Sequence, residues 1–210
     1  MRLVVFGATG GTGRQLVERG LSRGHEIIAA VRRPEAVTTR HDQLRVMKCN
    51  VLDPAAVRSV LSGADAALCA IGPANNRNPG TLISEGVANI VQGCSNQGVK
   101  RFVFESGLMV GDGSGLSLLG RLGVSIFRAI NRKLCEDKRI AEATIQKSGL
   151  DWVIVRPPTL ADLPASGDYK FGTNIRLNAA KKLAHTDVAD FMIKLAMSTE
   201  HNRTVLDVGH

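Results

Sequence analysis

A glycine-rich stretch near the start of the chain contains the first residues whose types and spacing point to chemistry. Gly7, Gly10 and Gly13 are spaced by three and directly follow the apolar residues 4–6. In such a turn the first glycine permits a tight bend, the second lets backbone N–H groups approach a pyrophosphate, and the third lets the next helix pack closely. The positive end of that helix favours phosphate. The spacing predicts a dinucleotide-binding turn, with a purely structural glycine turn as the alternative.

Two adjacent arginines indicate which dinucleotide would bind. Arg32 and Arg33 follow a second expected strand, residues 26–31, and the first acid after them is Glu35. Sites that prefer NAD usually place a carboxylate at this strand end for the ribose 2′-OH, whereas an arginine accommodates the 2′-phosphate of NADP. The guanidinium suits a phosphate in both charge and geometry. We therefore expect NADP(H), the alternative being that both arginines are solvated loop charges.

The elements that must position these residues alternate regularly between strand and helix, which predicts an α/β fold with a Rossmann-like, doubly wound parallel sheet. The glycine-rich stretch 107–123 is expected to be mobile, and Thr186 is expected to cap the last helix. Strands are expected over 44–49, 66–71, 101–105, 152–155 and 204–208, with a short candidate over 169–171, and helices over 54–61, from 82 to about 98, 126–147 and 187–197.

Length and composition fit one domain, residues 1–210, because 44% hydrophobic residues are enough for a full core. No apolar run is long enough to cross a bilayer, and the N-terminus reads as a core strand instead of a leader. We expect a cytoplasmic protein with no membrane partner. The four cysteines lack metal-type spacing, which predicts buried, reduced thiols and no metal site.

The net charge of +8 raises the question of nucleic acid binding. Aromatic residues make up only 4% of the chain, which leaves almost no platform for base stacking. Most of the cations are scattered, and a phosphate-bearing cofactor accounts for a positive cleft. We expect a small-molecule acceptor and no nucleic acid partner, with the chain a monomer or weak oligomer.

Four segments together resemble the atypical short-chain dehydrogenase/reductases. They are the glycine turn 7–13 (GATGGTG), the Arg32-Arg33 pair, residues 84–91 (SEGVANIV) and residues 148–158 (SGLDWVIVRPP). Over nearly the whole chain the likeness is greatest to the NADPH-dependent flavin reductase and biliverdin reductase B group, with NmrA-like proteins nearby. This resemblance implies a Rossmann fold, NADPH, and hydride transfer to a flavin or an open tetrapyrrole.

The resemblance also implies site residues. Ser106 would lie beside the nicotinamide, and the C-terminal part from about residue 157, with Pro158 and Thr159, would contribute the substrate side as a small lobe. The cofactor-binding residues would be Gly7, Thr9, Gly10, Gly11, Thr12 and Gly13 at the pyrophosphate turn, Arg32 and Arg33 at the 2′-phosphate, Asn50 and Val51 at the adenine, and Ile71 and Gly72 at the ribose and nicotinamide.

The chain departs from this family pattern at the catalytic acid. The larger superfamily uses a Tyr-x-x-x-Lys pair, and here the same register holds Leu134 and Lys138, while the only tyrosine is Tyr169. A histidine of the biliverdin and flavin group is replaced by Thr159. A simple carbonyl needs a proton donor as hydride arrives, whereas a conjugated acceptor can take its proton from water afterwards.

We therefore predict an NADPH-dependent oxidoreductase that acts on a conjugated acceptor, either a flavin, a quinone or a tetrapyrrole-like molecule. Ser106 and Lys138 are the candidate catalytic residues, unless they are a strand-end serine and a solvated lysine. His185, the most notable of the five histidines, is expected to be structural. A non-catalytic NADP(H)-binding sensor of the NmrA kind fits the missing tyrosine equally well, and a protein–protein scaffold would bind no cofactor.

Overall fold

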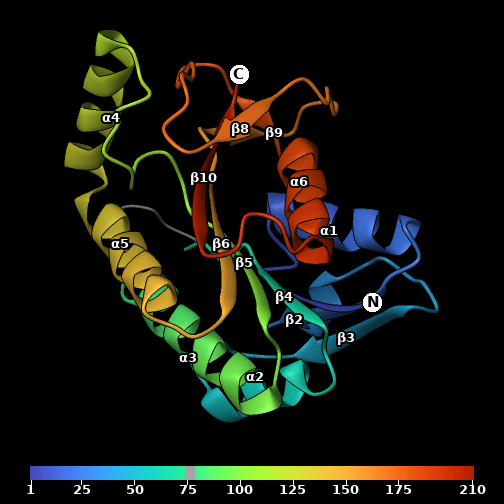
Figure 1. Ribbon diagram of the computed structural model, residues 1–210. Coiled ribbons are helices and arrows are strands. Elements are labelled where there is room, and N and C mark those ends of the chain that lie inside the picture. Colours follow the sequence, from blue (N-terminus) through green and yellow to red (C-terminus); the bar gives the residue numbers. More distant parts are fainter. Residues whose placement is uncertain (74–78) are drawn as a thin grey trace.

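An eight-stranded, mostly parallel sheet runs through the middle of the molecule in the computed structural model, which describes residues 1–73 and 79–210 (Figure 1). The strand order is β3-β2-β1-β4-β5-β6-β10-β8, and among the described strands β8 alone runs antiparallel, along β10. The bounds are β1 Arg2–Phe6, β2 Glu26–Val31, β3 Leu44–Lys48, β4 Ala66–Cys69, β5 Arg101–Glu105, β6 Asp151–Arg156, β8 Lys170–Gly172 and β10 Thr204–Gly209. The expected Rossmann-like α/β fold is confirmed.

Helices cover both faces of this sheet, which is why the strands β1, β2, β4, β5 and β6 are apolar except at their ends. One face packs against α1 (Gly11–Ser22) and α6 (His185–Met197). The other packs against α2 (Pro54–Leu61), α3 (Leu82–Gln97) and α5 (Arg132–Gln146). A short 3₁₀ turn, η1 (Pro34–Ala36), follows β2, and α4 (Leu118–Ile130) stands at the edge of the molecule above α5 (Figure 1).

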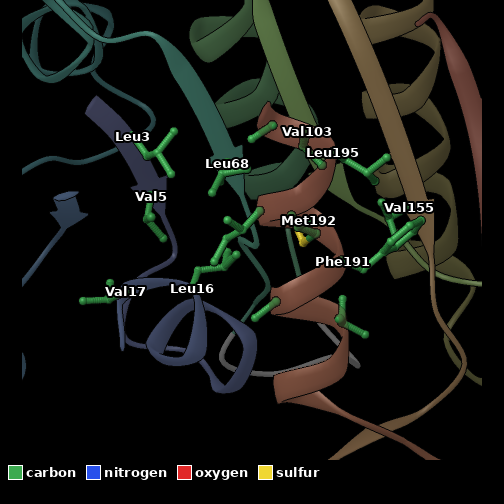
Figure 2. Packing of buried hydrophobic residues seen from close by; sticks show 14 of the residues in the cluster. Leu3, Val5, Leu16, Val17, Leu68, Val103, Val155, Phe191, Met192 and Leu195 are labelled. Atoms are coloured by element: carbon green, nitrogen blue, oxygen red, sulfur yellow. The ribbon is translucent and has the colours of Figure 1, made fainter. Parts of the chain in front are cut away.

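The side chains of β1 alternate between two cores. Leu3 and Val5 point toward α1 and α6, where Leu16 and Met192 meet them (Figure 2). Val4 and Phe6 point to the opposite core. The two-residue period of a strand thus fills both layers from a single apolar run and fixes the register of the sheet.

The strand order places the topological switch point between β1 and β4. From β1 the chain first builds outward through β2 and β3, then returns to add β4 on the other side. In such sheets ligands bind in the crevice beyond the carboxyl ends of the strands at this point. The turn 7–13, the Arg32-Arg33 pair, the Ile71-Gly72 pair and Ser106 all follow the carboxyl ends of parallel strands, so they gather at this edge.

The segment 107–147 differs from the expected pattern of elements in two ways. Residues 118–123 are the first turns of α4, which starts where the Ser117 hydroxyl accepts a hydrogen bond from Gly120 N at 3.2 Å. The single helix expected over 126–147 is two helices, because Asn131 (φ −113°, ψ 38°) leaves the helical region between α4 and α5.

Smaller differences occur elsewhere. Thr186 does not cap α6: the helix begins at His185 after Ala184, and the Thr186 hydroxyl donates to Gln15 Oε1 at 3.0 Å. The strands expected to end at 49 and 71 end at Lys48 and Cys69. Two short strands, β7 (Leu160–Ala161) and β9 (Leu183–Ala184), pair in parallel beside the main sheet and had no pattern long enough to predict.

All four cysteines are buried and free of disulfides. Burial raises the pKa of Cys69 and of Cys94 to about 12, which makes these thiols unreactive. Among the described residues, no three His, Cys, Asp or Glu side chains are grouped closely enough to hold a metal ion, and no helix combines the length and the apolar character needed to span a bilayer.

Candidate functional site

The glycine turn after β1 has the backbone geometry that its spacing predicts. Gly7 adopts φ +82°, and a Cβ there would lie 2.5 Å from the Ala70 carbonyl oxygen. A Cβ on Gly13 would lie 1.9 Å from the Gly7 carbonyl oxygen, so α1 packs directly on the turn. A Cβ on Gly10 would meet only Gly7 O, at 3.3 Å, and would otherwise face open space. Gly10 thus leaves the turn accessible to a ligand, while Gly7 and Gly13 hold its shape.

The start of α1 is prepared for an anion. Within the described chain no side chain caps its first N–H groups, and its first turn holds no acid. These N–H groups and the helix dipole therefore present positive charge at the turn.

A cavity of about 180 Å³ lies against this turn at the switch point. Seven of the predicted cofactor residues line it: Gly7, Thr9, Gly10, Arg32, Val51, Ile71 and Gly72. The remaining walls come from Ala30, Val31, Cys49, Ala70 and Leu82. The cavity runs from the glycine turn to the carboxyl ends of β2 and β4, the direction in which a dinucleotide would extend from pyrophosphate to adenine.

The other predicted cofactor residues lie outside the walls of this cavity. Gly13 packs on the turn, Arg33 is exposed before η1, and the Asn50 side chain accepts a hydrogen bond from Leu52 N at 3.2 Å. Gly11 and Thr12 face His185 instead: the Thr12 hydroxyl is 2.9 Å from His185 Nδ1, and a Cβ on Gly11 would lie 2.5 Å from the imidazole ring. Direct cofactor contacts stay predictions for these five residues and for the seven that line the cavity.

Ser106 and Lys138 are brought together although they are far apart in sequence. Lys138 Nζ donates to the Ser106 carbonyl oxygen at 2.6 Å, and burial lowers the pKa of this amine. The position of α5 is fixed next to Lys138, because the two carboxylate oxygens of Asp137 accept hydrogen bonds from Ile83 N at 2.9 Å and Ser84 N at 3.0 Å. The buried Ser106 hydroxyl has no hydrogen-bond partner in the described chain, and Ser106 does not line the cavity at the glycine turn.

Glu105 is a residue of this site that the sequence reasoning missed. It ends β5, and its Oε2 atom is buried without a hydrogen-bond partner among the described residues. Burial raises the pKa of Glu105, while Lys138, the Thr12 hydroxyl and His185 oppose the rise. The signal in the sequence was a carboxylate at the end of an otherwise apolar buried strand, where an acid is costly unless it is paired.

A second, larger cavity of about 450 Å³ opens beside the carboxyl ends of β5 and β6. Pro158 and Thr159, the predicted substrate residues, line it. Its other walls are formed by Leu108, Met109, Ser117, Leu119, Gly120, Gly123, Val124, Phe127, Pro157, Asn178, Ala179 and Ala180. This set includes no ionisable side chain, so the cavity suits an apolar ring system and supplies no general acid of its own.

The structure also shows the positions of Leu134, which replaces the catalytic tyrosine of the superfamily, and of Tyr169. Leu134 is buried in the core between the sheet and its outer helices. Tyr169 packs edge-on against Phe191 of α6, with ring centroids 5.8 Å apart, and lines neither cavity. A phenol acid is therefore missing from both cavities as the described residues form them.

Comparison with known proteins agrees with this geometry. A family model described as NAD(P)H-binding matches residues 7–199, from the glycine turn to the end of α6. A chloroplastic protein of Arabidopsis thaliana, itself uncharacterized, is 31% identical over 175 residues, which cover 80% of this chain. The aligned part is 62% of that plant protein, so the chain spans less than two thirds of the relative's length.

Two solved structures share the fold at low sequence identity. ChuY, an anaerobilin reductase from Escherichia coli O157:H7, has a TM-score of 0.81 and 22% identity, and the alignment covers 100% of this chain and 97% of ChuY. A short-chain dehydrogenase/reductase from Veillonella parvula in complex with NADP has a TM-score of 0.81 and 17% identity, with 100% and 94% coverage.

Proposed function

The chain belongs to the NAD(P)H-binding family, and on that premise we propose that it is an NADPH-dependent reductase of conjugated acceptors, either flavins, quinones or open tetrapyrroles. The observation that carries the proposal is the pairing of two cavities at one edge of the sheet. One is lined by the glycine turn, and the other is lined by residues without ionisable side chains.

The residues of the smaller cavity fit a dinucleotide. Gly10 leaves the space that a pyrophosphate needs, and the uncapped start of α1 offers N–H donors to it. Arg32 lines the cavity at the end of β2, and none of the described residues that line it is acidic. We propose that Arg32 binds the 2′-phosphate of NADPH, because a guanidinium suits a phosphate in charge and geometry. The Veillonella parvula protein of the same fold binds NADP.

The larger cavity supports the choice of acceptor. NADPH, when bound, supplies the hydride, and the protein's part is to hold the acceptor against it and to exclude water. We propose that residues from about 157 form the substrate side, since Pro157, Pro158 and Thr159 and the segment 178–180 all line this cavity. Ser106 does not line this cavity, but it lies two residues before Leu108, which does. We propose that its hydroxyl, buried and without a partner among the described residues, hydrogen-bonds the carboxamide or the acceptor.

The lack of a phenol acid determines which acceptors should react. Protonation in the transition state contributes typically ~10²–10⁴-fold to carbonyl reduction, and the larger cavity offers no acid for it. A flavin or quinone spreads the incoming charge over heteroatoms and takes its proton from water. We therefore expect reduction of conjugated acceptors and little or none of simple aldehydes and ketones.

The test is NADPH oxidation by the purified protein with a flavin, a quinone, an open tetrapyrrole and a simple ketone. We expect turnover with at least one of the first three, and a slower but measurable reaction after Ser106→Ala, because a serine that orients the ring does not transfer hydride. Robust ketone reduction would contradict the proposed acceptor class. Tight NADPH binding without turnover on the whole panel would instead identify a sensor of the NmrA kind.

A further inference from the structure

The outer side of α4 carries a row of large apolar side chains without a covering element in the described chain. Every residue of this 13-residue helix is at least partly exposed. Leu118, Leu122, Ile126 and Ile130 follow one another at intervals of four, with exposed fractions of 84%, 58%, 53% and 66%. Because residues four apart share one face of a helix, these side chains form a continuous stripe, which we call the α4 apolar stripe. Figure 1 shows the helix at the edge of the molecule, clear of the sheet.

Two segments, one of which includes α4, contain basic residues and no acidic ones. No acid occurs between Asp112 and Glu136, or between Asp168 and Asp187. These two segments lie against each other, since Leu177 N donates to the Gly115 carbonyl oxygen at 3.1 Å. Together they carry eight cations and no anion: Arg121, Arg128, Arg132, Lys133, Lys170, Arg176, Lys181 and Lys182.

The two arginines within α4 are held toward the inner side of the helix. Arg121 donates to the Gly113 carbonyl oxygen at 3.0 Å, and Arg128 donates to that of Met109 at 2.7 Å. They therefore border the stripe without covering it. Five of the other cations in these two segments are exposed and make no ion pair with any described residue: Arg132, Lys133, Arg176, Lys181 and Lys182.

We propose that α4 docks on the surface of an anionic lipid membrane, with the α4 apolar stripe among the acyl chains and the surrounding cations at the headgroups. An amphipathic helix with a basic border binds in this way through buried apolar area and attraction to anionic lipids. The sequence expectation of no membrane partner considered only segments that cross a bilayer. A helix that lies on the surface needs no spanning length.

Two features favour lipid over another protein as the occupant. Pairing of two copies through α4 would bring two acid-free, basic surfaces together, and like charges face to face are costly. Protein interfaces are enriched in aromatic anchors, whereas the stripe consists of leucine and isoleucine alone. Aliphatic side chains without hydrogen-bonding groups match an acyl-chain environment.

The test is sedimentation of the full chain with vesicles of phosphatidylcholine alone and of phosphatidylcholine mixed with phosphatidylglycerol. We expect binding to the mixed vesicles, weak binding to the neutral ones, and weakening by added salt. Ile126→Glu should reduce binding about tenfold or more, since it removes a buried apolar side chain and adds an anion. Arg132→Gln with Lys133→Gln should reduce it about twenty-five-fold, at about fivefold for each cation.

The matched control is Ile140→Glu, which makes the same change at a similarly exposed isoleucine of the neighbouring helix α5. It should leave vesicle binding close to that of the wild type, and circular dichroism should show that both variants are folded. The proposal is overturned if the folded wild type ignores anionic vesicles, if Ile126→Glu and Ile140→Glu bind alike, or if sedimentation shows that the stripe pairs two copies in place of lipid.

Discussion

Arg32 and Arg33 are adjacent in sequence but differently placed. Replacing each one alone therefore tests which arginine sets the preference for NADPH. Arg32 lines the smaller cavity, the proposed dinucleotide site, which we call the dinucleotide cavity, whereas Arg33 does not line it and precedes η1. Charge-assisted hydrogen bonds of ~1.5–3 kcal/mol correspond to roughly a tenfold to hundredfold preference for NADPH over NADH. Arg32→Ala should remove most of this preference and leave NADH affinity nearly unchanged, as measured by calorimetry.

Arg33→Ala is the matched control for this change and should keep most of the preference. Equal affinity of the wild type for both cofactors would refute the role given to Arg32. Equal effects of the two substitutions would mean that the arginines act only through their general positive charge.

Glu105 gives a prediction about stability and pH. Its pKa is raised in the folded protein by burial, so between the ordinary carboxyl pKa and the raised value the folded chain holds a proton that the unfolded chain has lost. Stability must therefore fall as pH rises through this interval. Glu105→Gln removes the titrating group and keeps its size, so the variant should gain stability relative to the wild type as pH rises.

Denaturant unfolding of both proteins over a series of pH values measures this difference. Glu35→Gln, which removes an exposed carboxyl, serves as the control. If the stability of the wild type and of Glu105→Gln changed in parallel with pH, the prediction would be wrong. The partners of Glu105 in the folded chain would then stabilise its carboxylate as well as water does in the unfolded chain.

The residues of the site could be predicted from sequence where the chemistry lies in consecutive residues. The glycine turn, Arg32, Val51 and the Ile71-Gly72 pair all line the dinucleotide cavity, because each follows a strand and the strand ends share one edge. The contact between Thr12 and His185 and the burial of Glu105 depend on α6 packing against α1. Residues so distant in sequence leave no local pattern.

At the scale of elements, the turn between β1 and α1 contains one glycine that matters for ligand binding and another that matters for folding. A Cβ at Gly10 meets only Gly7 O at 3.3 Å, whereas a Cβ at Gly13 would lie 1.9 Å from the same oxygen. Gly10→Val should therefore keep the fold but weaken NADPH binding by about a hundredfold or more, since its side chain enters the pyrophosphate space. Gly13→Val should lower the Tm because α1 must move away from the turn.

Circular dichroism and calorimetry on both variants check this prediction. A folded Gly10→Val protein that binds NADPH as the wild type does would show that the turn is purely structural. The Gly13→Val variant controls for the general effect of a branched side chain in this turn.

Strands and helices with strong apolar patterns were predictable, and those set by backbone conformation were not. The parallel strands and α1, α2 and α3 follow their sequence periodicity. The break at Asn131 is different, because its backbone leaves the helical region inside a sequence whose apolar period continues on both sides. The pairing of β7 with β9 joins two-residue strands whose partners lie more than twenty residues apart.

For the whole molecule, the sheet order explains why the two cavities lie at the same edge of the sheet. The switch point between β1 and β4 sets the dinucleotide cavity, and β5 and β6 extend the same edge toward the larger one. The outer wall of the larger cavity is α4, through Leu119, Gly120, Gly123, Val124 and Phe127. The helix thus borders the proposed acceptor cavity on one side and carries the proposed membrane surface on the other.

This arrangement predicts how the acceptor should be delivered if both proposals hold. A quinone with a long apolar tail is dissolved in the bilayer. Binding of α4 to the membrane would therefore place the proposed acceptor cavity close to such quinones. Ile126→Glu should then slow NADPH oxidation with a tailed quinone in anionic vesicles by about the same factor by which it weakens vesicle binding. The same variant should reduce a water-soluble quinone at the wild-type rate, because Ile126 lines neither cavity.

Ile140→Glu should match the wild type with both quinones. Loss of both reactions in Ile126→Glu would mean that α4 shapes the cavity itself, and wild-type rates with both, despite lost vesicle binding, would mean that the acceptor arrives through water.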